Sequence, residues 1–155
     1  PEMPALKQLM DMYTQTGATI LGCQQVPKEK VSSYGIVAGV PTINEQLMKV
    51  NDMIEKPSIE EAPSQMAVLG RYIITPDVFE VLQNTKPGKG GEIQLTDALK
   101  VMAKRENVYA YNFTGKRYDV GDKLGFLKAT VEFALRRDDL SGDFAEYLKT
   151  IVKDL

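Results

Sequence analysis

A carboxylate and an ammonium side chain stand next to each other in Glu55-Lys56-Pro57, where an apolar-flanked run ends. A carboxylate can accept hydrogen bonds from sugar hydroxyls, and a lysine ammonium can bind a phosphate group. Pro57 fixes its own φ and favours an extended backbone at Lys56. Glu55 and Lys56 are therefore expected to leave a stiff strand end toward opposite sides. Taken alone, the pair is more simply explained as charged residues that solvate a strand end.

Two further positions carry residue types suited to a binding site. Gly35 begins a predicted short strand, where a glycine lets a ligand approach the backbone closely, although an ordinary turn glycine is the simpler explanation. Asp119 precedes a glycine turn and a predicted helix, a common place for a metal ligand. Magnesium takes only one or two protein carboxylates and completes its shell with water and phosphate oxygens. Asp119 alone fits a turn residue and a ligand equally well, whereas Asp122 is better explained as the N-cap of the following helix.

A glycine-rich segment, residues 86–91, precedes a predicted helix over residues 93–106. Such a loop at a helix N-terminus can bind an anion. Its spacing differs from that of a P-loop, because no Lys-Ser or Lys-Thr pair follows the last glycine. We interpret it as a mobile loop before a helix start, with Glu92 and Asp97 favourably placed near the helix dipole.

Helices and strands alternate along the chain, which favours an α/β fold with helices on a mixed sheet. Apolar runs and alternation predict strands over residues 18–26, 34–37, 47–55, 66–74 and 108–113. The run over 66–74 is nearly continuously apolar and is expected to be buried on both faces. Residues 39–45 are turn-like, and Tyr109, Tyr111 and Phe113 are expected to share one strand face.

Helical spacing predicts the remaining elements. A helix follows Pro4 and stops at Gly17, and a short helix follows Thr75 as N-cap and Pro76 as first helical residue. Two more helices close the chain, the first over residues 123–137. In the second, apolar residues recur at i, i+3, i+4, i+7, i+8 and i+11, ending at Leu155.

Composition excludes several classes of function. The 155 residues carry a formal net charge of −2, which argues against a broad nucleic-acid surface. The absence of histidine removes Ser-His and Cys-His catalysis and every His-ligated metal site. Cys23 is the only cysteine, so no intrachain disulfide can form, and a buried thiol is expected. No apolar stretch approaches the ~20 residues of a membrane span, and the N-terminus does not have the pattern of a signal peptide. Because residue 1 is not methionine, we expect the chain to start inside a longer product.

The chain resembles the bacterial UTP–glucose-1-phosphate uridylyltransferases, also called UDP-glucose pyrophosphorylases, over essentially its whole length. Glu-Lys-Pro alone is a weak motif shared by sugar nucleotidyltransferases, whereas the blocks beginning at Gly91 and Gly115 are specific to this family. The matching segments are Pro4-Ala5-Leu6-Lys7-Gln8, Tyr34-Gly35-Ile36, Ile54-Glu55-Lys56-Pro57, Glu61-Ala62-Pro63-Ser64, Leu69-Gly70-Arg71-Tyr72-Ile73, Gly91-Glu92-Ile93-Gln94-Leu95-Thr96-Asp97-Ala98 and Gly115-Lys116-Arg117-Tyr118-Asp119-Val120-Gly121.

This resemblance implies a Rossmann-like nucleotidyltransferase fold and a set of roles. Gly35 would lie against the sugar, Glu55 would hold glucose hydroxyls, Lys56 would contact the sugar-linked phosphate, and Asp119 would ligate Mg²⁺. Lys56 and Asp119 would be the catalytic residues. The implied reaction is attack of a glucose-1-phosphate oxygen on the α-phosphorus of UTP, which gives UDP-glucose and pyrophosphate. Such a transfer depends mainly on positioning and charge neutralisation.

The chain departs from the family in one large respect. The family's N-terminal half carries a glycine-rich loop with a Gly-Thr-Arg core that holds UTP, the uracil-binding residues and a second metal-binding aspartate, and these 155 residues contain none of them. We therefore expect a C-terminal half, inactive alone, with residues 1–137 on the sugar-phosphate side and 138–155 as an amphipathic helix at a subunit interface. A cytoplasmic homo-oligomer, dimer or tetramer, without nucleic-acid or membrane partners is expected.

Two alternatives stay open. The chain could be a non-catalytic module that binds a sugar phosphate or serves assembly, or a nucleotidyltransferase for another sugar or base. Removal of the N-terminal strands would expose the flank of the sheet along residues 66–74, and an exposed strand edge invites pairing with another chain. We therefore expect self-association of the isolated chain.

Overall fold

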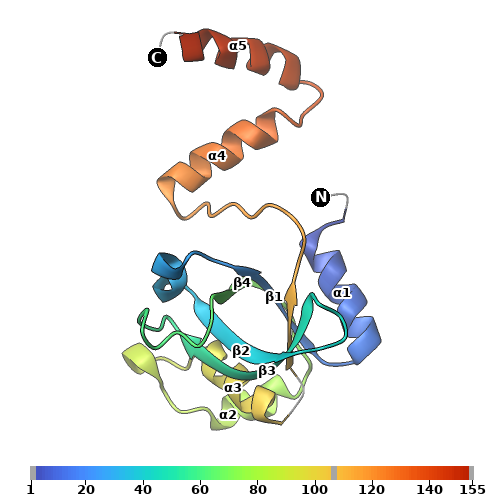
Figure 1. Ribbon diagram of the computed structural model, residues 1–155, viewed down its shortest axis with the longest axis vertical. Coiled ribbons are helices and arrows are strands. Elements are labelled where there is room, and N and C mark those ends of the chain that lie inside the picture. The colour runs from blue at the N-terminus through green and yellow to red at the C-terminus, as the bar shows by residue number, and fades with distance from the viewer. Residues whose placement is uncertain (1–2, 106–107, 154–155) are drawn as a thin grey trace. The chain divides into compact units, whose positions relative to one another are not determined.

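Five strands close into a ring in the computed structural model of the chain, which describes residues 3–105 and 108–153 (Figure 1). The order around the ring is β1, β4, β2, β3, β5 and back to β1. Strands β1 and β5 run parallel, and every other neighbouring pair is antiparallel. The strands are β1 (Thr19–Gln25), β2 (Gly35–Pro41), β3 (Leu47–Glu55), β4 (Met66–Ile73) and β5 (Val108–Asn112).

Helices connect and cover these strands, and the chain divides into two compact units, the second of which begins at Lys116. All five strands belong to the first unit. The helices of the first unit are α1 (Ala5–Thr16), η1 (Lys28–Ser33), α2 (Val78–Asn84), η2 (Lys89–Gly91) and α3 (Leu95–Lys104). The second unit contains α4 (Lys123–Ala134) and α5 (Ser141–Lys153).

The mixed strand directions agree with the expected α/β fold with helices on a mixed sheet, although the closure of the strands into a ring was not predicted. The flank expected to be exposed along residues 66–74 is paired with a second strand over only part of its length. Strand β4 pairs with β1 on one edge and with β2 on the other. The pairing with β2 is short, because only Ile36↔Ala67 and Val37↔Met66 are in register. Beyond it, Gly70 has a φ of +71° where the β1–β4 register shifts. A bulge of this kind bends a strand edge and makes it a poorer template for another chain.

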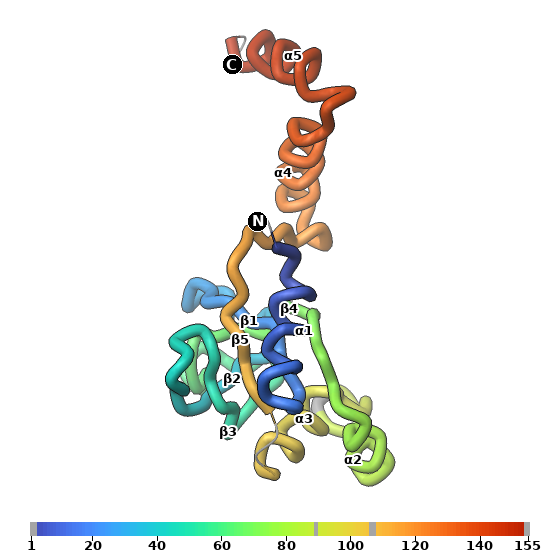
Figure 2. Tube along the Cα trace, turned by 90° about the vertical axis from the view of Figure 1, so that its right-hand side faces the viewer, coloured from blue at the N-terminus to red at the C-terminus, as the bar shows by residue number. Residues whose placement is uncertain are grey.

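Helix α1 packs along β1 and β4, as Figure 2 shows. Its predicted limits are confirmed, and Gly17 ends it with a φ of +64° and a hydrogen bond to the Tyr13 carbonyl. The face that packs on the sheet is formed by Leu9 and Met12, which join a core cluster with Ile20. The opposite side of α1 is also apolar and stays exposed at Leu6, Met10 and Tyr13.

Helices α2 and α3 cover the main core. Helix α3 packs on β3 and β5, and α2 packs against α3. Cys23 lies in this core with no exposed surface, as expected, and burial raises the pKa of its thiol far above the ordinary value. The expected shared face of the β5 aromatics is confirmed, because Tyr111 and Phe113 belong to one buried cluster with Tyr109 packed against it.

Several predicted boundaries differ from the structure. Strand β2 continues to Pro41, where a turn is predicted from residue 39, because β3 pairs with it along its whole length. In β4 only Ala67 and Val68 are buried, so the expected burial of both faces is wrong. Thr75 is not an N-cap, since its hydroxyl contacts the Thr19 hydroxyl at 2.9 Å and α2 begins three residues later.

The second unit contains the helices predicted at the C-terminal end. Asp122 is the N-cap of α4 as predicted, and its carboxylate accepts a 2.7 Å hydrogen bond from the Gly125 amide. No residue of α5 is buried, although the helix carries an amphipathic stripe. Leu155, the predicted end of that stripe, and Glu106, the predicted end of α3, lie outside the described residues. Within residues 3–105 and 108–153, no helix has the length and apolar character needed to cross a membrane.

Candidate sugar-phosphate site

Gly35 and Glu55 stand directly opposite each other in the β2–β3 ladder. This pairing brings the predicted sugar-side glycine and the predicted hydroxyl acceptor into one place. A Cβ added at Gly35 would lie 3.0 Å from Glu55 Oε2, closer than ordinary van der Waals contact. The glycine therefore leaves room for the Glu55 carboxylate, which is half-buried at the end of β3.

Helix α3 supplies a third member of this group. The Thr96 hydroxyl donates a 2.6 Å hydrogen bond to Glu55 Oε2, and Thr96 lies in the first turn of the helix. The bond fixes one carboxylate oxygen, and a carboxylate with two oxygens keeps further acceptor positions for sugar hydroxyls. Sequence reasoning assigns no separate role to Thr96, although it lies within the family-specific block that starts at Gly91.

Lys56 has a left-handed backbone, with a φ of +45°, the one non-glycine residue with positive φ in the described part of the chain. The expected extended geometry is therefore wrong. Its amide donates a 3.0 Å hydrogen bond to the Tyr34 carbonyl, which closes the β2–β3 ladder where β3 ends. A positive φ costs a residue with a Cβ of the order of 1–3 kcal/mol and is concentrated at functional sites.

The two charged side chains of the motif lie on the same side, in contrast to the prediction. Lys56 Nζ is 4.0 Å from Glu55 Oε1, and the side chains are 59% and 23% exposed. The left-handed turn at Lys56 is the physical reason, since it breaks the alternation of a regular strand. An exposed ammonium beside a half-buried carboxylate is suited to a ligand that carries both an anionic group and hydroxyls.

Tyr72 of β4 belongs to the surroundings of this site. Burial raises the pKa of its phenol, and the negative charge of Glu55 raises it further, with a smaller effect from Cys23. The phenol therefore stays protonated at neutral pH and can act as a hydrogen-bond donor near the carboxylate. Tyr72 stands in the matching segment from Leu69 to Ile73, but the sequence alone gives no sign that it approaches Glu55.

The glycine-rich segment, residues 86–91, packs on α3 and borders a pocket. In this segment, Gly88 packs closely on Asp97, which follows Thr96 in α3. A Cβ added at Gly88 would lie 2.3 Å from Asp97 Oδ2. Asp97 thus supports the loop in addition to its predicted place in the first turn of α3. A pocket of about 350 Å³ lies between this loop and the helices α2 and α3, and Glu55 is not among its lining residues.

Asp119, the predicted magnesium ligand, belongs to the second unit. Arg117 Nη2 lies 2.8 Å from its Oδ2, and the Gly121 amide donates a 3.2 Å hydrogen bond to its Oδ1. The backbone is fixed from another direction, because a Cβ on Gly125 would lie 2.0 Å from the Asp119 carbonyl oxygen. The first turn of α4 therefore leaves little freedom to the Asp119 main chain.

The donor set of this loop is compatible with a sparse magnesium site. The Asp119 carboxylate is 44% exposed and offers hard oxygen ligands, which magnesium prefers. Among the described residues, no group of three His, Cys, Asp or Glu side chains is placed to hold a metal ion. A single carboxylate meets the protein's share of a magnesium shell whose other positions are taken by water and phosphate oxygens.

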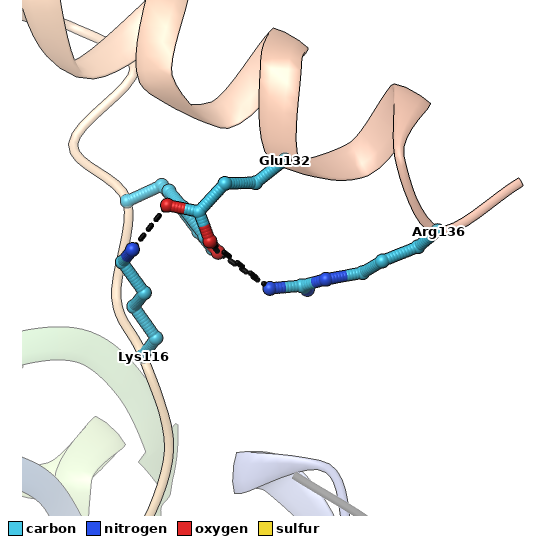
Figure 3. Close-up of polar contacts among 4 residues, drawn as sticks. Lys116, Glu132 and Arg136 are labelled. Carbon is cyan, nitrogen blue, oxygen red and sulfur yellow. Dashed lines mark hydrogen bonds and ion pairs between the residues drawn. The ribbon is translucent and has the colours of Figure 1, made fainter. Parts of the chain in front are cut away.

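A charged network attaches the start of this segment to α4 (Figure 3). Glu132 accepts hydrogen bonds from Lys116 and from the Tyr118 hydroxyl, and Arg136 Nη2 lies 3.3 Å from the same carboxylate. The guanidinium of Arg136 also donates a 2.6 Å hydrogen bond to the Tyr118 hydroxyl and stacks on the Phe133 ring at 5.1 Å. The hydrogen bonds from Lys116 and Tyr118 lower the pKa of Glu132, which therefore stays ionised at neutral pH.

Comparison with known proteins identifies the family of the chain. A family profile described as nucleotidyl transferase matches residues 2–135, most of the chain. The chain belongs to the nucleotidyl transferase family. Magnesium is the typical metal of this family, and the family profile includes the segments around both Glu55 and Asp119.

Individual members of the family are similar over part of their length. The UTP–glucose-1-phosphate uridylyltransferase 1 of Staphylococcus saprophyticus is 48% identical over 98% of this chain and 53% of the relative. The UTP–glucose-1-phosphate uridylyltransferase of Streptococcus pneumoniae is 43% identical over 99% of this chain and 51% of the relative. The chain thus spans about half the length of these nucleotidyl transferases.

Solved structures of the family show the same partial coverage. A UDP-glucose pyrophosphorylase complexed with UDP-glucose is 46% identical, with a TM-score of 0.81 over 86% of this chain and 50% of that one. A UTP-bound UGPase from Acinetobacter baumannii is 31% identical, with a TM-score of 0.78 over 92% of this chain and 48% of that one.

Proposed function

We propose that the chain is the C-terminal, sugar-phosphate half of a UTP–glucose-1-phosphate uridylyltransferase. The observation that carries this proposal is the group formed by Gly35, Glu55 and Thr96 with the Lys56 ammonium beside it. It joins a fixed acceptor for hydroxyls to an exposed cation for a phosphate, and it lies in a member of the nucleotidyl transferase family. The relatives that this chain matches at 43–48% identity are UTP–glucose-1-phosphate uridylyltransferases.

In this proposal each residue has a distinct task. Glu55 accepts hydrogen bonds from glucose hydroxyls, and Thr96 holds the carboxylate in the orientation that allows this. Lys56 pairs with the phosphate of glucose-1-phosphate and neutralises part of its charge, which keeps the attacking oxygen in place. Asp119 is the one metal ligand from this chain. When bound, Mg²⁺ supplies neutralisation of the charge on the phosphate oxygens.

The assignment to the C-terminal half rests on which motifs the 155 residues contain. The segments around Glu55 and Asp119 are present, whereas a Gly-Thr-Arg loop for the nucleotide is absent from the sequence. We therefore expect this chain to bind glucose-1-phosphate weakly by itself and not to catalyse the transfer. Half of a metal site without a nucleotide cradle gives little transition-state stabilisation.

The test is pyrophosphate release from UTP, glucose-1-phosphate and Mg²⁺, measured with this chain alone and after mixing with the matching N-terminal half of a close relative. Activity in the mixture only, lost on Lys56→Ala, supports the proposal. Turnover by the pure chain would contradict the half-site assignment. Saturable binding of glucose-1-phosphate with no turnover in either sample would favour the alternative of a non-catalytic sugar-phosphate-binding module.

The second unit suggests a subunit contact. Helix α5 buries none of its residues, and Tyr147 and Val152 on it are 60% and 67% exposed. A thirteen-residue helix is marginal in water without a partner for its apolar side. We propose that residues 138–155 serve a homo-oligomer interface, as dimer or tetramer. Sedimentation of the chain and of Val152→Asp tests this, since a substitution at an interface lowers the molar mass whereas a substitution on a free surface leaves it unchanged.

A further inference from the structure

Asp119 already has a charged partner inside its own loop. Arg117 Nη2 and Asp119 Oδ2 are 2.8 Å apart, and the two side chains are 29% and 44% exposed. A guanidinium at this distance neutralises much of the carboxylate charge and occupies one of its two oxygens. Part of the charge of the proposed metal ligand is therefore neutralised by the protein itself.

The two members of this pair are attached to the chain differently. A Cβ added at Gly125 in α4 would lie 2.0 Å from the Asp119 carbonyl oxygen, and Asp122 caps the same helix through the Gly125 amide. Arg117 contacts the carboxylate through the end of a long, flexible side chain, so its guanidinium can swing away without a backbone change. The ordinary way to open the carboxylate is thus a rotation of the Arg117 side chain.

We propose that Arg117 is the resting counter-ion of Asp119 and competes with the divalent cation for this carboxylate. The proposal rests on the proposed function, because it requires Asp119 to be a metal ligand. A guanidinium and a divalent cation at contact distance from the same carboxylate repel each other. Arg117 therefore weakens cation binding in the free chain and leaves Asp119 when a cation takes its place.

The competition makes cation binding depend on phosphate. Arginine binds phosphate oxygens in a bidentate manner, so a phosphate ligand gives the displaced guanidinium a new partner. The cation then binds more tightly when a phosphate compound is present than when it is absent. Arg117 couples the two ligands in this way, so that the site fills with cation and phosphate together.

The test uses Mn²⁺ as a paramagnetic substitute and the amide resonance of Gly121 as the reporter. This amide donates to Asp119 Oδ1, so Mn²⁺ bound at the carboxylate broadens its signal. The Mn²⁺ concentration that halves the signal measures affinity without any catalytic turnover. Arg137→Gln is the matched control, because Arg137 forms a bidentate pair with Asp139 at the same spacing in the same unit.

Removal of the Arg117 charge should strengthen Mn²⁺ binding, whereas loss of a purely structural contact of Arg117 would weaken it or leave it unchanged. Arg117→Gln should lower the half-broadening concentration roughly three- to ten-fold, the size expected for removal of one partly exposed competing charge. Arg137→Gln should leave it unchanged within about two-fold. Adding inorganic pyrophosphate should tighten Mn²⁺ binding in the native chain more than in Arg117→Gln. If Arg117→Gln weakens Mn²⁺ binding or has no effect, or if pyrophosphate acts equally on both proteins, the proposal is wrong.

Asp119→Asn separates this proposal from the function on which it rests. If the Gly121 signal broadens equally in Asp119→Asn and in the native chain, Asp119 is not a cation ligand and the metal assignment itself fails. If Asp119→Asn abolishes the broadening while Arg117→Gln does not strengthen it, the metal assignment stands and only the counter-ion role of Arg117 is overturned.

Discussion

Gly35 faces Glu55 across the β2–β3 ladder so closely that a single added methyl group would lie 3.0 Å from the Glu55 carboxylate. The same methyl group would be 3.6 Å from the Thr96 hydroxyl. The space between Gly35 and the carboxylate is therefore too narrow for an additional methyl group without a shift of Glu55. The contact also provides a direct way to move Glu55 without removing its charge.

Gly35→Ala should displace the Glu55 carboxylate by a few tenths of an ångström and weaken the binding of glucose-1-phosphate by about ten-fold. The fold should persist, because Gly35 is not one of the described glycines with a positive φ. Alanine can therefore adopt the backbone conformation of this position. Titration calorimetry and thermal unfolding measure the two effects. Gly142→Ala is the matched control: no atom lies within 4 Å of its added Cβ, so it should leave binding unchanged. Unaltered affinity in Gly35→Ala would exclude a role of this contact in sugar binding.

Lys56→Gly should raise stability while it removes binding of glucose-1-phosphate. Lys56 has a φ of +45°, which glycine adopts without the steric cost of a Cβ, so the free energy of unfolding should rise by about 1 kcal/mol. Lys56→Ala loses the same ammonium but keeps the Cβ, and its stability should stay near that of the native chain. Chemical denaturation compares the two variants. Equal stability of the glycine and alanine variants would show that the backbone at this position is not strained.

Thr96→Val should weaken glucose-1-phosphate binding although Thr96 need not touch the ligand. The substitution keeps the shape of the side chain and removes the 2.6 Å hydrogen bond to Glu55, a bond to a charged group that contributes about 1.5–3 kcal/mol. Thr96→Ser keeps the hydroxyl and should retain most of the affinity. A binding titration of the three proteins decides the point. The positioning role would be refuted if valine and serine gave the same affinity.

Asp52→Asn should reduce stability more at neutral pH than in acid. Asp52 Oδ1 lies 2.7 Å from Lys100 Nζ, and this hydrogen bond lowers the pKa of the carboxylate. A lowered pKa stabilises the folded state above the unfolded value of about 3.9, and the contribution is lost as the pH falls through the folded value. Because the Asp52 side chain is 41% exposed, the effect should be below about 1 kcal/mol.

Urea denaturation of native chain and Asp52→Asn at pH 7 and pH 3 provides the comparison. The stability difference should be larger at pH 7 than at pH 3. Lys100→Gln removes the partner and should show the same pattern. A difference of equal size at both pH values would mean that the ion pair is not its cause.

Local patterns predict most elements of this chain but not how they come together. The limits of α1 and of β3 agree with the structure, since Gly17 and Pro57 are strong local signals for the end of an element. The closure of the strands and the extension of β2 depend on pairing between distant segments. Neither pairing partner nor register is encoded in the period of one strand.

In the candidate site, too, the sequence identifies residues but does not predict their geometry. Gly35 and Glu55 are recognisable as motif residues, and the structure places them opposite each other. The left-handed backbone at Lys56 runs against the local preference before proline, so the orientation of its side chain could not be read from the sequence. Thr96 approaches Glu55 only because α3 packs on β3, a contact between segments 41 residues apart.

The burial of Cys23 makes the chain its own indicator of unfolding. Its thiol has no exposed surface and burial keeps it protonated, so alkylating reagents cannot modify it while the surrounding core is intact. Since it is the only cysteine, each labelled molecule has opened its core at least once. The labelling rate in native buffer therefore reports how often the closed ring of strands opens, on a sample that needs neither dye nor engineered probe.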